Sequence, residues 1–272
     1  MLEIIKIIIL GIVEGITEWL PISSTGHLIL VEDLLKLGQS EKFISTFLIL
    51  IQLGAILAVA GTFFHKLNPF SSTKTEVKRH QTWSLWLKII VGSIPAMILG
   101  LLFDDIIEEK LLNPITVAIA LIAYGIAFII IERRNADRDN LDLITLDKMS
   151  LKQAFGIGCF QALALIPGTS RSGSTILGGT LLGMKRVAIA EFSFFLAIPV
   201  MFGASFLKLF KIGFIFSVTE WLLLGLGFIV ALIISLLVIR WLLNYIKKHD
   251  FQIFGWYRII LGLMVLASFI WK

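Results

Sequence analysis

The chain has 272 residues, of which 57% are hydrophobic and 16% are charged, and its mean hydropathy is +0.93. Soluble domains contain about 45–50% apolar and about 25% charged residues, so this composition excludes a soluble globular protein and predicts several crossings of a membrane. The net charge of +5 does not indicate a nucleic-acid partner, because the basic residues lie in short loops between apolar runs.

A first polar stretch runs from Glu14 to His27. The chain does not begin like a cleaved signal peptide, because Glu14 and Glu18 occupy the place of the apolar core and the cleavage site. Their four-residue spacing puts both carboxylates on one helix face. Two such oxygen donors suit a divalent cation, Mg²⁺ or Ca²⁺, or proton transfer. The alternative is a pair of interfacial glutamates near a helix end.

Pro21 ends the first short helix, and the run Ser23, Ser24, Thr25 and Gly26 has the composition of a cap and turn that open a second short helix. The free N–H groups of a helix start suit a phosphate. His27 follows Ser24 by three residues, which makes the two a candidate nucleophile and base. This spacing taken alone favours a structural histidine.

Six apolar runs are long enough to be membrane spans. They are 43–64, 84–103, 114–131, 188–207, 221–239 and 251–271. Glu191 and Arg258 are among the few charges inside them, and they are candidates for a structural ion pair.

A second polar stretch runs from Pro167 to Thr175. Arg171 carries a forked, permanently charged donor set that suits phosphate, and the alternative is a structural pair with Glu14 or Glu18. The surrounding side chains supply further hydroxyl donors. These are Ser170, Ser172, Ser174 and Thr175.

The two polar stretches each precede three long apolar runs, and their prolines are 146 residues apart. Lys and Arg residues collect in loops on one side of a membrane. The loops rich in Lys and Arg can share one side here only if each polar stretch is a re-entrant helix pair, which enters and leaves the membrane from the same side. Three spans per half then make the second half inverted. We therefore expect an all-α polytopic membrane protein with two inverted-topology repeats, at 1–135 and 150–272, whose polar stretches meet in the membrane.

These residues resemble a known family, the bacterial undecaprenyl-diphosphate phosphatases of the bacitracin-resistance type. Its Glu-x-x-x-Glu motif matches Glu14 and Glu18, its Pro-x-Ser-Ser-Thr-Gly-His run matches Pro21 to His27, and its Pro-Gly-x-Ser-Arg-Ser-x-x-Thr motif matches Pro167 to Thr175. The resemblance extends over the whole chain.

The resemblance implies an enzyme that hydrolyses undecaprenyl diphosphate to undecaprenyl phosphate and inorganic phosphate, recycling the lipid carrier for peptidoglycan synthesis and conferring bacitracin resistance. It further implies the bacterial cytoplasmic membrane as location, a homodimer, and no nucleic-acid partner. The implied roles are catalysis and cation binding for Glu14 and Glu18, nucleophile for Ser24, assistance by His27 and diphosphate binding by Arg171. Candidates for contacts to the substrate phosphates are Ser23, Thr25, Gly26, Ser170, Ser172, Ser174 and Thr175.

A different class of function stays open at this point. Inverted repeats with broken helices are also typical of transporters, so a transporter or flippase of a polyprenyl phosphate or another anion is the alternative. The sequence does not separate a serine nucleophile from a metal-activated water, and it does not show from which side the site opens.

Overall fold

The computed structural model describes residues 2–135, 143–213 and 215–270, and within these ranges the chain is helical without any strand. The elements in chain order are α1 (Leu2–Thr17), α2 (Ser24–Leu35), α3 (Glu41–Thr62), α4 (Phe64–Leu67), α5 (Glu76–Leu111), α6 (Pro114–Arg134), α7 (Leu151–Ala162), the 3₁₀ turn η2 (Leu163–Leu165), α8 (Arg171–Leu181), α9 (Arg186–Ile212), α10 (Val218–Tyr245) and α11 (Gln252–Ile270).

Six helices are long and apolar enough to cross a membrane, which confirms the six predicted spans. They lie in α3, α5, α6, α9, α10 and α11. The predicted boundaries differ from the observed ones mainly at α5, which has 36 residues and continues through Pro95 in its interior. The helix begins before the apolar run, because the N-capping side chain of Thr75 stabilises a polar first turn. The end of the last predicted run, Trp271, lies outside the described residues.

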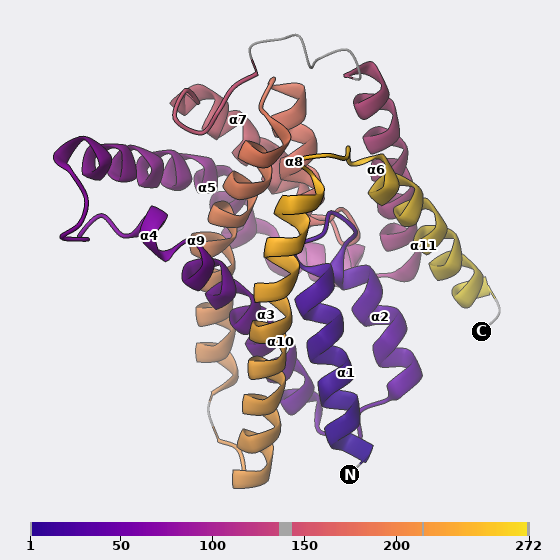
Figure 1. Ribbon diagram of the computed structural model, residues 1–272. Helices are drawn as coiled ribbons and strands as arrows, with labels where there is room; N and C mark the ends of the chain where they lie inside the picture. Colours follow the sequence, from indigo (N-terminus) through magenta and orange to yellow (C-terminus); the bar gives the residue numbers. More distant parts are fainter. Residues whose placement is uncertain (1, 136–142, 214, 271–272) are drawn as a thin grey trace.

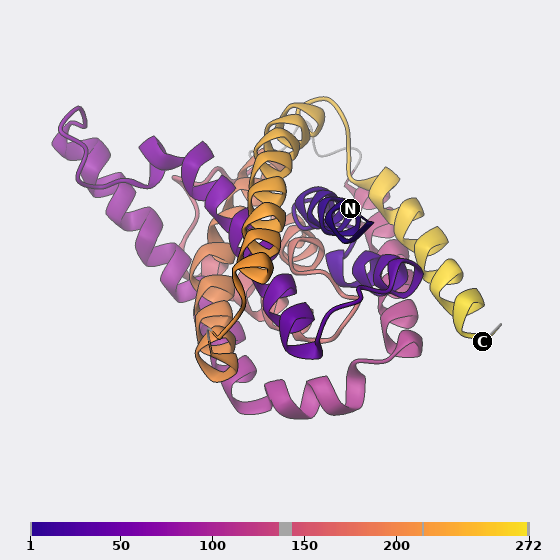
Figure 2. The same cartoon turned by 90° about the horizontal axis from the view of Figure 1, so that it is seen from below.

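Four helices of 11 to 16 residues form two packed pairs, α1 with α2 and α7 with α8. In Figure 1, α1 and α2 occupy the lower part of the molecule and α7 and α8 the upper part. Seen from below, α1 and α2 are surrounded by longer helices (Figure 2). The protein therefore encloses the segments that carry the polar stretches.

Glycines allow two pairs of helices to approach closely. A Cβ on Gly11 of α1 would lie 3.0 Å from the carbonyl oxygen of Gly227 in α10, and one on Gly158 of α7 would lie 2.2 Å from the carbonyl oxygen of Gly92 in α5. Small residues at such crossings bring backbones together in membrane proteins. Each short helix is thus seated against a long one.

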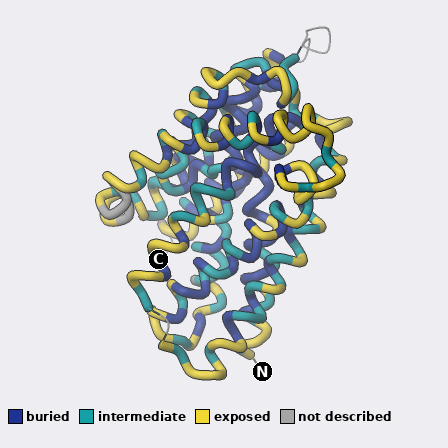
Figure 3. The backbone as a smooth tube through the Cα atoms, turned by 90° about the vertical axis from the view of Figure 1, so that its left-hand side faces the viewer, coloured by how far each residue is buried: buried dark blue, intermediate teal, exposed yellow. Residues whose placement is uncertain are grey.

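The largest core cluster surrounds Trp19, Phe192, Phe194 and Phe195, where α9 meets the loop after α1. Buried backbone fills the centre of the molecule, and exposed segments run along its outside (Figure 3). Many exposed side chains on the long helices are large and apolar, for example Leu101, Leu222 and Met264. This pattern is expected when the exterior faces lipid.

Candidate functional site

The two polar stretches begin their helices with the same backbone device. Ser23 before α2 and Ser170 before α8 both have positive φ, 74° and 71°, and the hydroxyl of each accepts a hydrogen bond from the backbone N–H three residues later, at Gly26 and Gly173. Positive φ is unfavourable for a residue with a Cβ and persists only where the surroundings enforce it. Sequence reasoning predicted the caps and missed this conformation, because serine carries no signal for it.

Glu18, directly after α1, joins the two stretches. Its Oε2 accepts a hydrogen bond from Ser24 Oγ at 2.8 Å, and its Oε1 lies 3.2 Å from Nη2 of Arg171. The side chains of Arg171 and Glu18 are only 11% and 7% exposed. The structure therefore brings together three predicted site residues that are separated by up to 153 positions in the chain.

Arg171 is held from several sides. Its Nη1 donates to the carbonyl oxygen of Ser193 at 2.6 Å, and its guanidinium lies over the ring of Trp19, 5.5 Å from the centroid. Its Nε is buried and has no hydrogen-bond partner among the described residues. The guanidinium is therefore fixed in place and retains a donor for a ligand.

The hydroxyls around Arg171 bond mainly to the protein itself. Ser172 Oγ donates to the carbonyl oxygens of Glu18 and Leu20, at 3.3 and 3.1 Å. Thr175 Oγ1 bonds the carbonyl oxygen of Arg171, and Ser174 Oγ bonds that of Phe160. These side chains fasten the loops together in the structure. Among the predicted phosphate contacts, Thr25 is exposed and Gly26 is buried, and the predicted nucleophile Ser24 is partly exposed.

His27 bonds to different partners from those of this junction. Its Nδ1 is 2.7 Å from the carbonyl oxygen of Ser23, and its Nε2 is 2.7 Å from the hydroxyl of Tyr257, with the two rings stacked. Because a carbonyl only accepts, Nδ1 carries a proton. The hydrogen bond that the spacing suggested between Ser24 and His27 is replaced by the bond from Ser24 to Glu18.

Glu14 is completely buried, and neither of its carboxylate oxygens has a hydrogen-bond partner among the described residues. It lies within electrostatic range of both Glu18 and Arg171. No cluster of three or more His, Cys, Asp or Glu side chains suited to a metal occurs in the described ranges. Hard cations often take one or two carboxylates and complete their shell with water and phosphate oxygens, and the orphaned oxygens of Glu14 fit that requirement.

Arg258 in α11 is a residue of this region that sequence reasoning misassigned. It is fully buried and donates to the carbonyl oxygens of Pro21, Gly168 and Thr169 at 2.8 to 3.2 Å. The predicted pair with Glu191 is wrong, because Glu191 binds Lys66 at 2.5 Å. Arg258 therefore ties the loop before α2 to the loop before α8. Its position inside an apolar span was the only signal of a special role.

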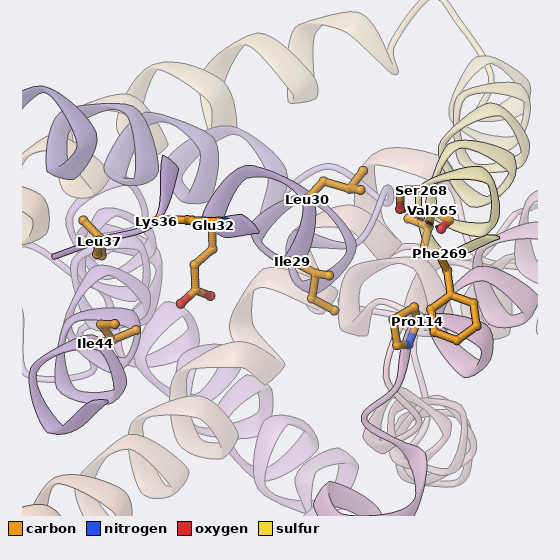
Figure 4. Close-up of a pocket in the computed structure, with 10 residues that line it drawn as sticks. All are labelled: Ile29, Leu30, Glu32, Lys36, Leu37, Ile44, Pro114, Val265, Ser268 and Phe269. Carbon is orange, nitrogen blue, oxygen red and sulfur yellow. Dashed lines mark hydrogen bonds between the residues drawn. The ribbon is translucent and has the colours of Figure 1, made fainter. Parts of the chain in front are cut away.

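Two cavities adjoin α2. One, of about 450 Å³, is lined mostly by apolar side chains of α1, α2, α10 and α11, together with His27, Thr17 and Tyr257. The other, of about 430 Å³, lies between α2, α11 and the start of α6, and Figure 4 shows its lining, including Glu32 and Lys36. The first cavity shares His27 with the polar stretch, whereas the lining of the second contains none of the predicted site residues.

Comparison with known proteins places the chain in a family. The family model described as bacitracin resistance protein BacA matches residues 7–264. Undecaprenyl-diphosphatase 1 of Clostridioides difficile (strain 630) is 56% identical over 269 residues, which cover 99% of this chain and 97% of that protein. Undecaprenyl-diphosphatases of Limosilactobacillus fermentum and Enterococcus faecalis (strain V583) are 55% and 54% identical, each with 98% of its length covered. With its polar stretches joined through Glu18 and its sequence matched almost from end to end, the chain belongs to the bacitracin resistance protein BacA family.

Proposed function

We propose that this protein hydrolyses undecaprenyl diphosphate to undecaprenyl phosphate and inorganic phosphate. The observation that carries the proposal is the convergence of Ser24 and Arg171 on the carboxylate of Glu18, in a chain that is more than half identical to named undecaprenyl-diphosphatases. A hydroxyl, a carboxylate that accepts its proton and a guanidinium that binds phosphate are the groups that phosphoryl transfer needs.

In this reaction Arg171 binds the terminal phosphate of the substrate and offsets the charge that develops there. Ser24 Oγ attacks the terminal phosphorus while its proton passes to Glu18 Oε2, and the bond to the bridging oxygen breaks to release undecaprenyl phosphate. Water then hydrolyses the phosphoserine to release inorganic phosphate. The Ser24–Glu18 distance of 2.8 Å suits this proton transfer.

His27 has a different place in the proposal. Because its ring bonds Ser23 and Tyr257, we assign it the positioning of the strained turn that presents Ser24. It also lines the largely apolar cavity beside α2. That cavity suits the hydrocarbon chain of a lipid whose diphosphate lies at Arg171.

A divalent cation, Mg²⁺ or Ca²⁺, belongs to the proposal as a cofactor, and Glu14 together with Glu18 would hold it. The buried, unpartnered oxygens of Glu14 support this assignment. The cation would supply positive charge to the substrate phosphates.

We further propose that residues 1–135 and 150–272 are inverted repeats, each with a re-entrant helix pair. Helix packing supports this, because α1 lies on α10 as α7 lies on α5, and α3 on α10 as α9 on α5. Gly11 and Gly158, which make two of these contacts, are 147 residues apart, as are Ser23 and Ser170. Location in the bacterial cytoplasmic membrane and assembly as a homodimer are further proposals, which come from the family resemblance alone.

The transporter alternative is distinguished by the reaction product. Purified wild-type protein in detergent should release phosphate from undecaprenyl diphosphate, whereas a pure carrier should not. The Arg171→Ala variant should lose at least about 10²-fold in rate, and Ser24→Ala should lose a comparable factor. Arg240→Ala, which removes an exposed arginine of α10, serves as the control and should retain the wild-type rate.

Each measurement is repeated with EDTA and after return of Mg²⁺ or Ca²⁺. Loss of activity in EDTA and recovery with the cation would support the assignment of Glu14 and Glu18. Near-normal turnover by Arg171→Ala would overturn the proposed site, and unchanged activity in EDTA would remove the cation from it.

A further inference from the structure

A second polar region is a basic pocket beside the start of α5, whose lining contains no residue of the two polar stretches. Its volume is about 220 Å³, and its lining includes four lysines and one aspartate. These are Lys66, Lys74, Lys78, Lys88 and Asp147. A water molecule occupies about 30 Å³, so the pocket has room for a polar group much larger than water.

Lys88 is the most deeply placed of these lysines. It is 7% exposed, and its Nζ donates to the carbonyl oxygens of Leu146 at 3.0 Å and Asp147 at 3.2 Å. An ammonium group has three N–H donors, and burying its charge is costly unless negative charge compensates it. The negative charge of Asp147 compensates part of this cost, and the two carbonyls fix the position of Nζ and leave one donor for an anion.

Two of the other lysines, Lys74 and Lys66, are also held in place. Lys74 Nζ donates to Thr82 Oγ1 at 2.7 Å and to the carbonyl oxygen of Lys66 at 3.2 Å. Lost hydration, and then the positive charge of Lys78, lower the pKa of Lys74. Within the part of the chain that the structure describes, Lys66 is the lysine of this group with a carboxylate at hydrogen-bond distance, that of Glu191. A negatively charged ligand would therefore reduce the repulsion between the positive charges of Lys74 and Lys78.

The position of the pocket indicates the kind of anion. The segment from α4 to the first turns of α5 projects sideways from the helical body in both cartoon views (Figures 1 and 2). It carries Phe70 and Trp83, which are exposed and pack edge to face at 5.7 Å, and Trp86 donates to the carbonyl oxygen of Leu67. Tryptophans with one polar contact are typical of the depth of lipid head groups.

We propose that this pocket binds a phosphate-bearing anion, supplied either by the head group of an anionic phospholipid or by free phosphate. Lys74, Lys78 and Lys88 contact the phosphate oxygens. Basic pockets beside membrane-spanning helices bind anionic head groups. The site is separate from the junction at Glu18 and does not depend on the proposed hydrolysis.

The test compares two double variants that remove the same charge. In Lys74→Gln/Lys78→Gln the pocket loses two lysines, and in Lys247→Gln/Lys248→Gln two exposed lysines after α10 are lost. Native mass spectrometry of the detergent-solubilised protein measures retained phosphatidylglycerol against phosphatidylcholine, with and without inorganic phosphate as competitor. Thermal unfolding of each variant verifies that it is folded.

We expect the wild type and the Lys247→Gln/Lys248→Gln variant to prefer phosphatidylglycerol, and the pocket variant to bind it about tenfold or more weakly. Competition by inorganic phosphate would identify a site for the free ion, and its failure to compete would identify a head-group site. Equal loss in both variants, or neither a lipid preference nor phosphate binding in the wild type, would overturn the proposal.

Discussion

The starts of α2 and α8 share a backbone and differ in chemistry. Both are capped by a serine with positive φ, and in both a glycine is the third residue after that serine. The first residue of α2 is Ser24 and the first residue of α8 is Arg171, and these two reach the same carboxylate. The strained cap therefore directs the side chain that follows it toward Glu18, and the identity of that side chain decides what it contributes there.

The strongest way to break the comparison is to remove the charge that both helix starts share. Glu18→Gln keeps the size of the side chain and loses the carboxylate that Ser24 and Arg171 contact. We expect phosphate release to fall by about 10²–10⁴-fold, the usual range for loss of an acid–base group. Assays with purified protein in detergent measure this.

The matched control is Glu76→Gln, an exposed glutamate in the first turn of α5. It should leave the rate close to that of the wild type. A Glu18→Gln protein with more than a third of the wild-type activity would mean that Glu18 is a structural link only.

A second prediction concerns the tie between the two loops. Arg258→Met removes three hydrogen bonds from a buried cation to the carbonyl oxygens of Pro21, Gly168 and Thr169. Since bonds to charged groups contribute about 1.5–3 kcal/mol each and methionine fills part of the space, we expect the free energy of unfolding to fall by about 3 kcal/mol. Thermal unfolding in detergent, followed by circular dichroism, measures the change.

Arg258→Lys should lie between the wild type and Arg258→Met, because an ammonium retains the charge and reaches fewer of the carbonyls. Arg240→Met, at an exposed position of α10, is the control and should change stability little. If Arg258→Met unfolds like the wild type, the two loops are held together by other contacts.

The smallest expected effect sharpens the comparison at the caps themselves. At Ser23 and Ser170, alanine loses the capping hydroxyl and keeps the unfavourable φ, whereas glycine loses the hydroxyl and relieves the strain. Glycine variants should therefore be more stable than alanine variants at both positions, by about 1 kcal/mol beyond the usual advantage of glycine as a cap.

Ser150 provides the reference for that margin, because it caps α7 with an ordinary φ of −81°. The Gly-minus-Ala difference in unfolding free energy should be smaller at Ser150 than at Ser23 or Ser170. Equal margins at all three serines would show that positive φ carries no measurable strain at the two polar stretches.

Much of this arrangement could be predicted from the sequence. Long apolar runs identified the six spans, and polar residues within oily sequence identified the two stretches, since burial of such groups is costly without a partner. The pairing of Glu18 with Arg171 was foreseen only as one of two alternatives. These successes depend on composition and on spacing along single helices.

Contacts between helices could not be predicted in the same way. The three-residue spacing of Ser24 and His27 placed them one turn apart, but the rotation of α2 turns Ser24 toward Glu18 and His27 toward Tyr257. Likewise, Lys66 of the short helix α4 binds Glu191, and Arg258 bonds to backbone carbonyls instead. A single sequence contains no information about which faces of separate helices meet.

Glu18 contacts both Ser24 and Arg171, and this has a consequence for the enzyme without substrate. A phosphate that approaches Arg171 must compete with the carboxylate already bound to it at 3.2 Å. In the proposed reaction, a phosphate that binds Arg171 would free Glu18 from this ion pair while the bond from Ser24 to Glu18 remains, and it would bring its phosphorus atom close to Ser24. Without a ligand, the charges of Glu18 and Arg171 neutralise each other, and a bound phosphate would take the place of Glu18 at Arg171.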